Sequence, residues 1–376
     1  MADVSSPQLP ITARASAGRN IITRVALAST VLISALWIYF KIFSCFSPWD
    51  DEGYLMIGVQ SFVHGDTLYD KVYAQYGPFY YLVQWFYYLV VGAVTHDHVR
   101  FLTGFLWLAS ASVLAWCAHR LTQSWILTGF VYFAILKVLT FFAWSPGHPE
   151  EICLLLVACL LAISCNIGEQ IKMWQAGVLG FLLSALALTK INIGFYVGAA
   201  LLLVLLRSSS LRVLREQLFW MSGLASIIAV VVIMFPLMGF AWDRSFCLMM
   251  IFSLLAVLAA EFVTPPDAAV GLQVWPILIV VAVGSGLLIL SPFLLQGTTL
   301  YAFLWSTVLQ YKDFSRNWYI PLHCGGNTVA FSVLSFALAV VWLRSKRTLS
   351  LRKTLTFWLQ MLKGAIGLFA LTLAII

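Results

Sequence analysis

The sequence has 376 residues, of which 62% are apolar and only 10% are charged, and its mean hydropathy is +0.94. An ordinary soluble domain has about 25% charged residues, so this composition excludes a soluble globular fold. Apolar runs of about 20 residues, the length that crosses a bilayer, follow one another with short polar breaks. The formal net charge of +7 comes from Lys and Arg spread over short loops, so no basic face for nucleic acid is expected.

The N-terminal segment, residues 1–21, is rich in Ser, Ala, Pro and Arg, which predicts a disordered cytoplasmic tail. The apolar run from Ile21 to Phe43 is too long for the core of a signal peptide and precedes no small-residue cleavage site, so we expect an uncleaved signal anchor. Over residues 22–376 we predict an all-α, polytopic bundle of about eleven transmembrane helices. The expected spans are 22–44, 99–118, 124–143, 150–166, 174–188, 191–206, 217–238, 245–262, 273–294, 327–343 and 356–376.

The charges between these spans predict the orientation of the bundle. With a cytoplasmic N-terminus, the inner segments hold thirteen Lys and Arg and the outer segments hold six, which is the bias of cytoplasmic loops. The thirteen are Arg14, Arg19, Arg24, Arg120, Lys172, Arg207, Arg212, Arg215, Arg344, Lys346, Arg347, Arg352 and Lys353, and the six are Lys71, Arg100, Lys190, Arg244, Lys312 and Arg316. We therefore expect a multi-pass protein of the plasma (inner) membrane.

The stretch Phe79–Val94 is apolar but has only 16 residues and is crowded with Tyr, Phe and Trp. Aromatic side chains with polar tips prefer the level of the lipid headgroups, so we predict a helix lying in the interface rather than a span. Residues 45–98 then form one long excursion on the outer side. A second outer loop is expected at residues 295–326, where mixed aromatic and charged residues fit lipid phosphate or sugar, or an aromatic belt.

The first outer loop is acidic. It holds six acids against the single Lys71, a net charge of −5, and three of the acids stand together at Asp50, Asp51 and Glu52. The segment that follows, Glu52–His64, carries its apolar residues on one helical face and predicts an amphipathic helix on the membrane. Asp50 or Asp51 would cap this helix, but a cap needs one acid, and three adjacent acids favour a functional use.

Several short motifs occur in a specific order along residues 25–210. They are Asp50-Asp51-Glu52-Gly53-Tyr54, His64-Gly65-Asp66-Thr67-Leu68-Tyr69-Asp70, Gly77-Pro78-Phe79-Tyr80-Tyr81-Leu82, Arg100, Gly147-His148-Pro149-Glu150-Glu151 and Leu188-Thr189-Lys190-Ile191-Asn192-Ile193-Gly194. This arrangement resembles the GT-C superfamily of integral membrane glycosyltransferases, in particular the branch of protein O-mannosyltransferases and lipid A aminoarabinose transferases. Where some relatives carry an acid-Lys-Pro triplet, this chain has Tyr76-Gly77-Pro78.

The resemblance implies transfer of a sugar, with inversion, from a polyprenyl-phosphate donor to a hydroxyl acceptor on the outer face of the membrane. A hydroxyl becomes a good nucleophile when a carboxylate takes its proton, and Asp51 is the first choice for this base, followed by Asp50 and Glu52. The cations expected to bind the donor phosphate are Arg100, Lys190, Lys312 and Arg316. Further substrate-loop residues are expected to be Tyr54, His64, Asp70, Tyr76, His148 and Glu150.

Alternatives stay open at this stage. Arg100 could reach the headgroups without binding a substrate. A multi-pass transporter or lipid-linked sugar flippase is the main alternative function, although we find no internal repeat; a non-catalytic scaffold is the other. No cofactor is required by the sequence, but a divalent metal ion on the loop carboxylates and His64, His96, His98 or His148 is a further alternative. No Walker A or dinucleotide-binding motif is present.

Overall fold

The computed structural model describes residues 11–46, 51–168, 170–235, 238–239, 241–263, 270–310 and 326–344. In these ranges the chain forms helices and no strand, which confirms the all-α prediction for them. The helices are α1 (Ile11–Phe43), α2 (Asp51–Val63), α3 (Pro78–Val91), α4 (His96–Thr122), α5 (Trp125–Leu139), α6 (Pro149–Cys165), α7 (Met173–Ala187), α8 (Ile191–Arg207), α9 (Phe219–Met234), α10 (Ala241–Val263), α11 (Val274–Leu295), α12 (Leu300–Leu304) and α14 (Gly326–Arg344), with short helical turns η1 (Thr140–Phe142), η2 (Val213–Leu218) and η4 (Trp305–Leu309).

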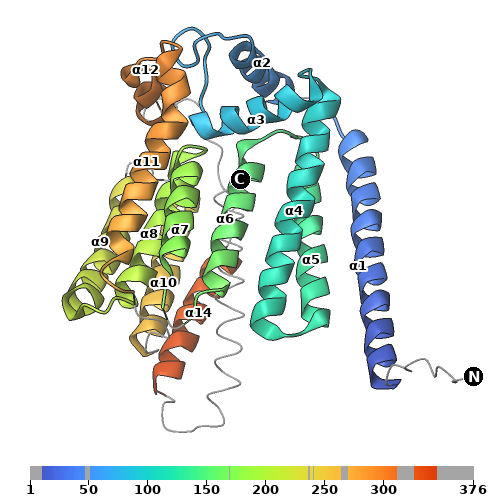
Figure 1. Cartoon of the computed structure of the whole chain (residues 1–376). Helices are drawn as coiled ribbons and strands as arrows, with labels where there is room; N and C mark the ends of the chain where they lie inside the picture. Colours follow the sequence, from blue (N-terminus) through green and yellow to red (C-terminus); the bar gives the residue numbers. More distant parts are fainter. Residues whose placement is uncertain are drawn as a thin grey trace, which may run out of the picture.

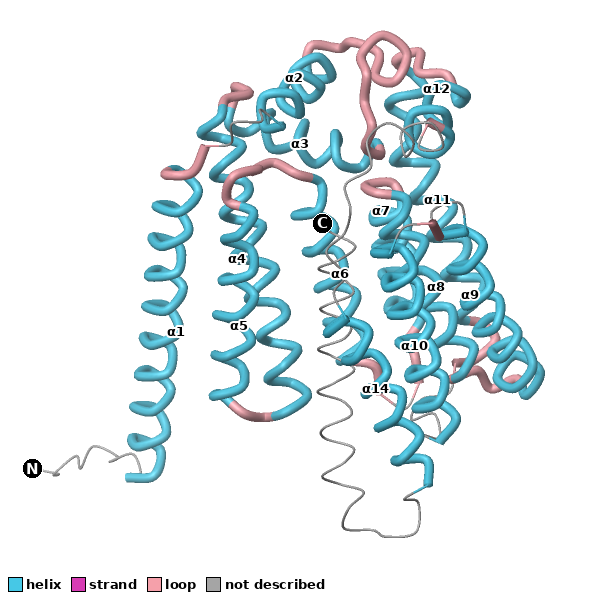
Figure 2. Tube along the Cα trace, turned by 180° about the vertical axis from the view of Figure 1, so that it is seen from behind, coloured by secondary structure: helices cyan, strands magenta, loops and turns pink. Residues whose placement is uncertain are grey.

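Most of the helices run alongside one another, and α2, α3 and α12 lie together at one end of the bundle, called the α2–α3 end below (Figures 1 and 2). Within the described ranges, five helical segments are long and apolar enough to cross a membrane: Val25–Phe43, His96–Thr122, Trp125–Phe142, Val213–Val232 and Val274–Leu295. Their length and composition indicate a membrane protein. The helix α1 begins at Ile11, inside the predicted tail, and the predicted span at 356–376 lies outside the described residues.

The helix α3 lies across the end of the bundle, and α4 has one end beside it (Figure 1). Pro78 fixes its first turn, and Gly92 ends it in the left-handed conformation at φ 82°. Although aromatic residues fill this helix, Tyr80, Tyr81 and Tyr88 are buried against neighbouring helices. The arrangement agrees with the prediction that this stretch does not span the membrane.

The helix α2 packs its predicted apolar face into the same end of the bundle. Leu55, Val59 and Phe62 are buried, and the Phe62 ring stacks on Phe293 of α11 with centroids 4.7 Å apart. The opposite face is open, since Ile57 is 63% exposed. The predicted apolar face of α2 is therefore present, but it packs against the protein, whereas the sequence analysis expected it to lie on the membrane.

The loop after α2 is tied to the segment between α11 and α12. The Asp70 carboxylate accepts hydrogen bonds from the Thr299 backbone N–H at 2.9 Å and from its hydroxyl at 3.1 Å, while the Thr298 hydroxyl donates to the Leu68 carbonyl at 3.0 Å. Thr67 donates to the Gln296 carbonyl at 3.1 Å. Asp70, expected in the substrate loop, thus joins two loops that are far apart in the sequence.

The next part of the loop rests directly on the turn between α7 and α8. The Gly77 N–H donates to the Thr189 carbonyl at 3.0 Å, and the Phe79 N–H donates to the Leu188 carbonyl at 2.9 Å. A Cβ at Gly77 would lie 2.0 Å from the Leu188 carbonyl oxygen, so only glycine allows this approach of two backbones. The Gly77-Pro78 motif therefore meets the Leu188-Thr189-Lys190 motif through their main chains.

We expect Gly77→Ala to lower the free energy of unfolding by about 3 kcal/mol, because the methyl group forces the loop off the α7–α8 turn. Unfolding of the detergent-purified protein, followed by helical circular dichroism during titration with SDS, measures this change. Gly129→Ala is the control, because nothing lies within 4 Å of a Cβ at that position in α5. Equal stability of the two variants would contradict the close approach at Gly77.

Candidate functional site

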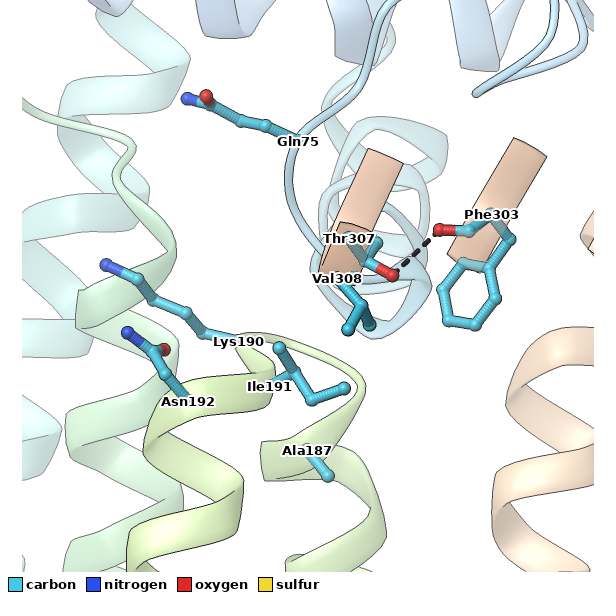
Figure 3. A pocket seen from close by; sticks show the side chains of 9 residues that line it. Gln75, Ala187, Lys190, Ile191, Asn192, Phe303, Thr307 and Val308 are labelled. Carbon is cyan, nitrogen blue, oxygen red and sulfur yellow. Dashed lines mark hydrogen bonds between the residues drawn. The ribbon is translucent and has the colours of Figure 1, made fainter. Parts of the chain in front are cut away.

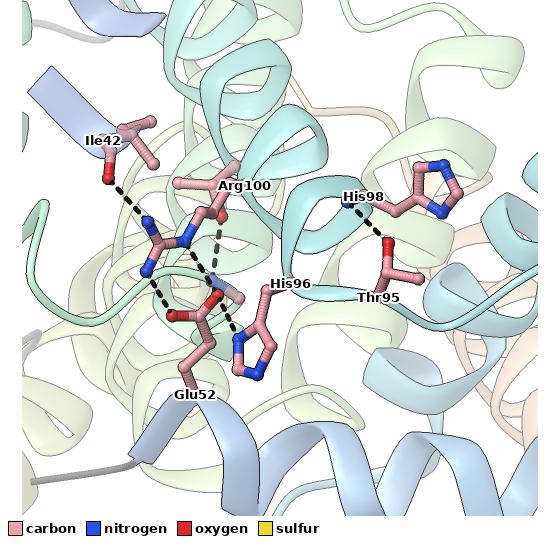
Figure 4. A network of polar contacts seen from close by, with 8 residues as sticks. Ile42, Glu52, Thr95, His96, His98 and Arg100 are labelled. Carbon is pink, nitrogen blue, oxygen red and sulfur yellow. Dashed lines mark hydrogen bonds and ion pairs between the residues drawn. The ribbon is translucent and has the colours of Figure 1, made fainter. Parts of the chain in front are cut away.

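A buried ion pair holds α1, α2 and α4 together at the α2–α3 end (Figure 4). The Arg100 guanidinium donates from Nε and Nη2 to the two Glu52 carboxylate oxygens at 3.0 and 2.9 Å, and from Nη1 to the Ile42 carbonyl at 3.2 Å. Arg100 and Glu52 are 3% and 8% exposed. A cation beside the C-terminal turn of α1 and an acid in the first turn of α2 both suit the helix dipoles.

Two further groups complete this ion pair. The Phe46 ring covers the guanidinium, with 4.4 Å between the Arg100 Cζ and the ring centroid. The His96 Nδ1 lies 3.0 Å from a Glu52 oxygen, and the imidazole is exposed. Since three N–H groups of the buried Arg100 donate to Glu52 and Ile42, its contacts are those of a structural cation.

The start of α6 is fixed by the Gly147-His148-Pro149-Glu150-Glu151 motif. Gly147 adopts φ 82°, where a side chain is strained, and a Cβ there would lie 2.5 Å from Val99 of α4. The Gly147 N–H donates to the Thr103 hydroxyl at 2.8 Å, and that hydroxyl donates to the Glu151 carboxyl at 2.8 Å. Thr103 lies one turn after Arg100 on α4, so one helix face holds both polar clusters.

The hydroxyl of Tyr80 supports the same turn from α3, donating to the Gly147 carbonyl at 2.8 Å. Burial, followed by the neighbouring Tyr81, raises the pKa of Tyr80 well above its ordinary value. The hydroxyl therefore stays protonated at any physiological pH and remains a donor. Through Tyr80 and Thr103, α3 and α4 both orient the residues that begin α6.

The second buried ion pair links α6 to the α7–α8 turn. The Lys190 ammonium donates to one oxygen of the Glu150 carboxylate, and His148 Nδ1 lies 2.8 Å from the other. Glu150 is 8% exposed, and the side chains of His148 and Lys190 are 26% and 20% exposed. One carboxylate thus binds a cation and an imidazole that both remain within reach of solvent or ligand.

Lys190 also lines a cavity of about 320 Å³ between the loop that joins α2 to α3, the α7–α8 turn and the chain after α11. The lining residues are Gln75, Gly77, Ala187, Lys190, Ile191, Asn192, Phe303, Thr307 and Val308. Gln75, Lys190 and Asn192 extend toward one side, and Phe303 and Val308 stand on the other (Figure 3). The N-terminus of α8 begins at Ile191 in the cavity wall and adds a positive partial charge.

No protein-family model, curated protein or solved structure matches this chain. An assignment of function therefore depends on the motif order in the sequence and on the geometry described above. The geometry brings three of the quoted motifs into contact, those that contain Gly77, Glu150 and Lys190.

The remaining predicted site residues lie as follows. Asp51 is the first residue of α2, next to the buried Glu52, whereas Asp50, Lys312 and Arg316 lie outside the described residues. His64 is exposed at the end of α2, where its Nδ1 lies 2.8 Å from the Gln60 carbonyl. The ring centroid of Tyr54 lies 6.3 Å from Tyr73, and that of Tyr76 lies 6.0 Å from His148.

Sequence reasoning did not single out Thr103, Gln75 or Asn192. Thr103 is one helical turn from Arg100, and this spacing is the signal by which it could have been found. Gln75 and Asn192 flank motifs or lie inside them but have no distinctive pattern. Among the His, Cys, Asp and Glu side chains that the structure describes, no group of three could hold a metal ion.

Proposed function

We propose that this chain is an integral membrane glycosyltransferase of the GT-C type, which moves a sugar from a polyprenyl-phosphate donor to a hydroxyl acceptor. The observation that carries the proposal is the position of Lys190, which pairs with Glu150 and lines a cavity that is polar on one side and apolar on the other. An amphipathic cavity of this kind suits a ligand with a phosphate and a hydrocarbon chain. The acceptor is a lipid, a glycan or a protein hydroxyl.

The proposal includes the topology expected from the sequence: about eleven spans, a cytoplasmic N-terminus in the plasma membrane, and the α2–α3 end on the non-cytoplasmic side. The fold supports this topology, because the two loops predicted to be outer, at 45–98 and 295–326, both include segments at the α2–α3 end. Labelling a single Cys introduced at the exposed Asp66 with a membrane-impermeant reagent tests the topology. If that Cys is protected from the reagent in intact cells, the acidic loop lies in the cytoplasm, and the proposed donor cannot meet the catalytic base.

The donor phosphate is assigned to Lys190 and the N-terminus of α8. A helix N-terminus attracts a phosphate through its free N–H groups and its dipole, and the Lys190 ammonium adds a full charge beside it. Phe303, Val308 and Ile191 offer apolar contact for the first carbons of the polyprenyl chain. Lys312 and Arg316 are retained as additional candidates from the second outer loop.

The base is assigned to the acids at the start of α2, with Asp51 first and Asp50 second. In an inverting transfer, the acceptor oxygen bonds to the anomeric carbon as the bond from that carbon to the phosphate oxygen breaks. A carboxylate that takes the hydroxyl proton in this step contributes about 10²-fold or more to the rate. Glu52 is assigned a supporting role, because Arg100 and His96 already occupy its oxygens.

The test is transfer by the purified protein in lipid vesicles that contain a labelled polyprenyl-phosphate sugar and a set of hydroxyl acceptors. We expect Asp51→Asn to lower the transfer rate by about 100-fold or more. Asp66→Asn, which alters an exposed acid of the same loop, should transfer at the normal rate. Equal rates for wild type and Asp51→Asn would remove Asp51 from the mechanism, and movement of the labelled lipid across the bilayer without transfer would favour the flippase.

A further inference from the structure

The polyprenyl phosphate that the proposed transfer releases differs from the donor in the charge on its phosphate, and the described cations do not balance this difference. The donor is a phosphodiester with one negative charge, whereas the departing polyprenyl phosphate is a monoester whose second ionisation falls near pH 6. The oxygen that the sugar leaves therefore gains either a proton or a second charge. Lys190 and Glu150 together are neutral, and Arg100 is paired with Glu52, so neither buried pair has a charge in excess.

His148 stands beside the Lys190–Glu150 pair with one ring nitrogen held and the other available. Its Nδ1 faces the Glu150 carboxylate at 2.8 Å, and since that carboxylate also binds Lys190, it stays ionised and keeps the proton on Nδ1. Among the described residues, the structure gives Nε2 no hydrogen bond. The Tyr76 ring packs edge-on against the imidazole, with 6.0 Å between centroids, and limits its rotation.

The other ionisable groups near His148 are already engaged. Glu151 accepts from Thr103 on the α4 side, and the Tyr80 hydroxyl donates to the Gly147 carbonyl. An imidazole whose Nδ1 proton is held by a carboxylate can, when both ring nitrogens are protonated, donate the second proton from Nε2. His148 is therefore the side chain in this cluster that is built to deliver a proton toward the neighbourhood of Lys190.

We propose that His148 is a catalytic residue of this site, which donates its Nε2 proton to the phosphate oxygen released from the sugar; this inference rests on the proposed function. The acceptor oxygen bonds to the anomeric carbon, the bond to the phosphate oxygen breaks, and its electron pair stays on that oxygen and takes the proton from His148. The acceptor proton goes to the base at the start of α2. Water then carries this proton back to the imidazole, so the cycle needs no further reactant.

Glu150 acts in this step as a positioning residue. Its two oxygens fix the directions of Lys190 and of the His148 ring, and its first-turn position on α6 favours the ionised carboxylate through the helix dipole. The phosphate is thereby held by Lys190 on one side and by Nε2 on the other. This arrangement distinguishes the monoester, which has three phosphate oxygens that are not esterified, from the diester, which has two.

The experiment compares the binding of two probes to the full chain in nanodiscs: a polyprenyl monophosphate and its methyl diester. We expect His148→Gln to weaken binding of the monophosphate by about tenfold or more, the effect of losing a hydrogen bond to a charged group, and to leave diester binding within twofold. Unchanged diester binding also shows that the variant is folded. His119→Gln, which alters a histidine in the last turn of α4 whose ring stacks on Trp125, should change neither affinity.

If the glutamine variant does not fold, His148→Asn provides the same comparison. Equal weakening of both probes, or of neither, in a folded variant would overturn the role of His148. Failure of the wild-type protein to transfer any sugar would instead overturn the proposed function while the two affinities remain measurable. Normal transfer by a variant that has lost its preference for the monophosphate would count against His148 alone.

Discussion

Arg100→Met is expected to lower the free energy of unfolding by about 3–5 kcal/mol, which is the typical effect of leaving a buried charge without its partner. Glu52, at 8% exposure, would lose both of its guanidinium hydrogen bonds and, among the described residues, keep the contact with His96. The Ile42 carbonyl in the last turn of α1 would lose its donor as well. Unfolding by SDS titration of the protein in mild detergent micelles measures the change.

The double variant Arg100→Met, Glu52→Leu separates the ion pair from the packing of its side chains. With both charges removed, no unpaired carboxylate remains, so the double variant should be more stable than Arg100→Met alone. The exposed pair of Arg212 and Glu216 has the same 2.9 Å separation, and Arg212→Met should have little effect because solvent screens that pair. A double variant as unstable as the single one would show that the guanidinium acts through its shape and not through its charge.

The sequence predicted several features of the α2–α3 end because they depend on local rules. The period of Leu55, Val59 and Phe62 identified the packed face of α2, and the aromatic content of Phe79–Val94 indicated a helix that does not cross the bundle. The sequence also placed Lys190 and Glu150 among the site residues, and the structure pairs their side chains.

Other features could not be predicted, because they depend on contacts between distant parts of the chain. Asp50, Asp51 and Glu52 are chemically similar neighbours, and only the rotation of α2 against α4 decides that Glu52 meets Arg100, 48 residues away. Asp70 accepts a hydrogen bond from Thr299, which is 229 residues away, so no local sequence pattern predicts that it joins two loops. The eleven-span count likewise depends on segments whose length alone does not decide whether they cross the membrane.

Lys190→Met is expected to weaken binding of polyprenyl phosphate and to lower the transfer rate by about 100-fold or more. A positioned cation beside developing phosphate charge acts in an environment poor in water, where its loss has an effect comparable to the loss of an oxyanion-hole donor. Lys190 lines the cavity and is the N-terminal flanking residue of α8, so methionine keeps the apolar contacts and removes only the charge. Equilibrium binding in nanodiscs and initial transfer rates in vesicles measure the two effects.

Glu150→Gln is the matched variant, because it removes the negative charge that competes with phosphate for the same ammonium. If the Lys190 charge binds the donor, this variant should bind the methyl diester of polyprenyl phosphate at least as tightly as the wild type, while its transfer rate falls because the carboxylate no longer orients His148. If instead Lys190 and Glu150 form only a structural pair, both variants should lose stability and affinity together. Opposite effects of Lys190→Met and Glu150→Gln on affinity would therefore show that Lys190 binds the ligand and is not only a structural cation. A negatively charged ligand is attracted by Lys190 and repelled by Glu150, so its affinity responds in opposite directions to the loss of each charge.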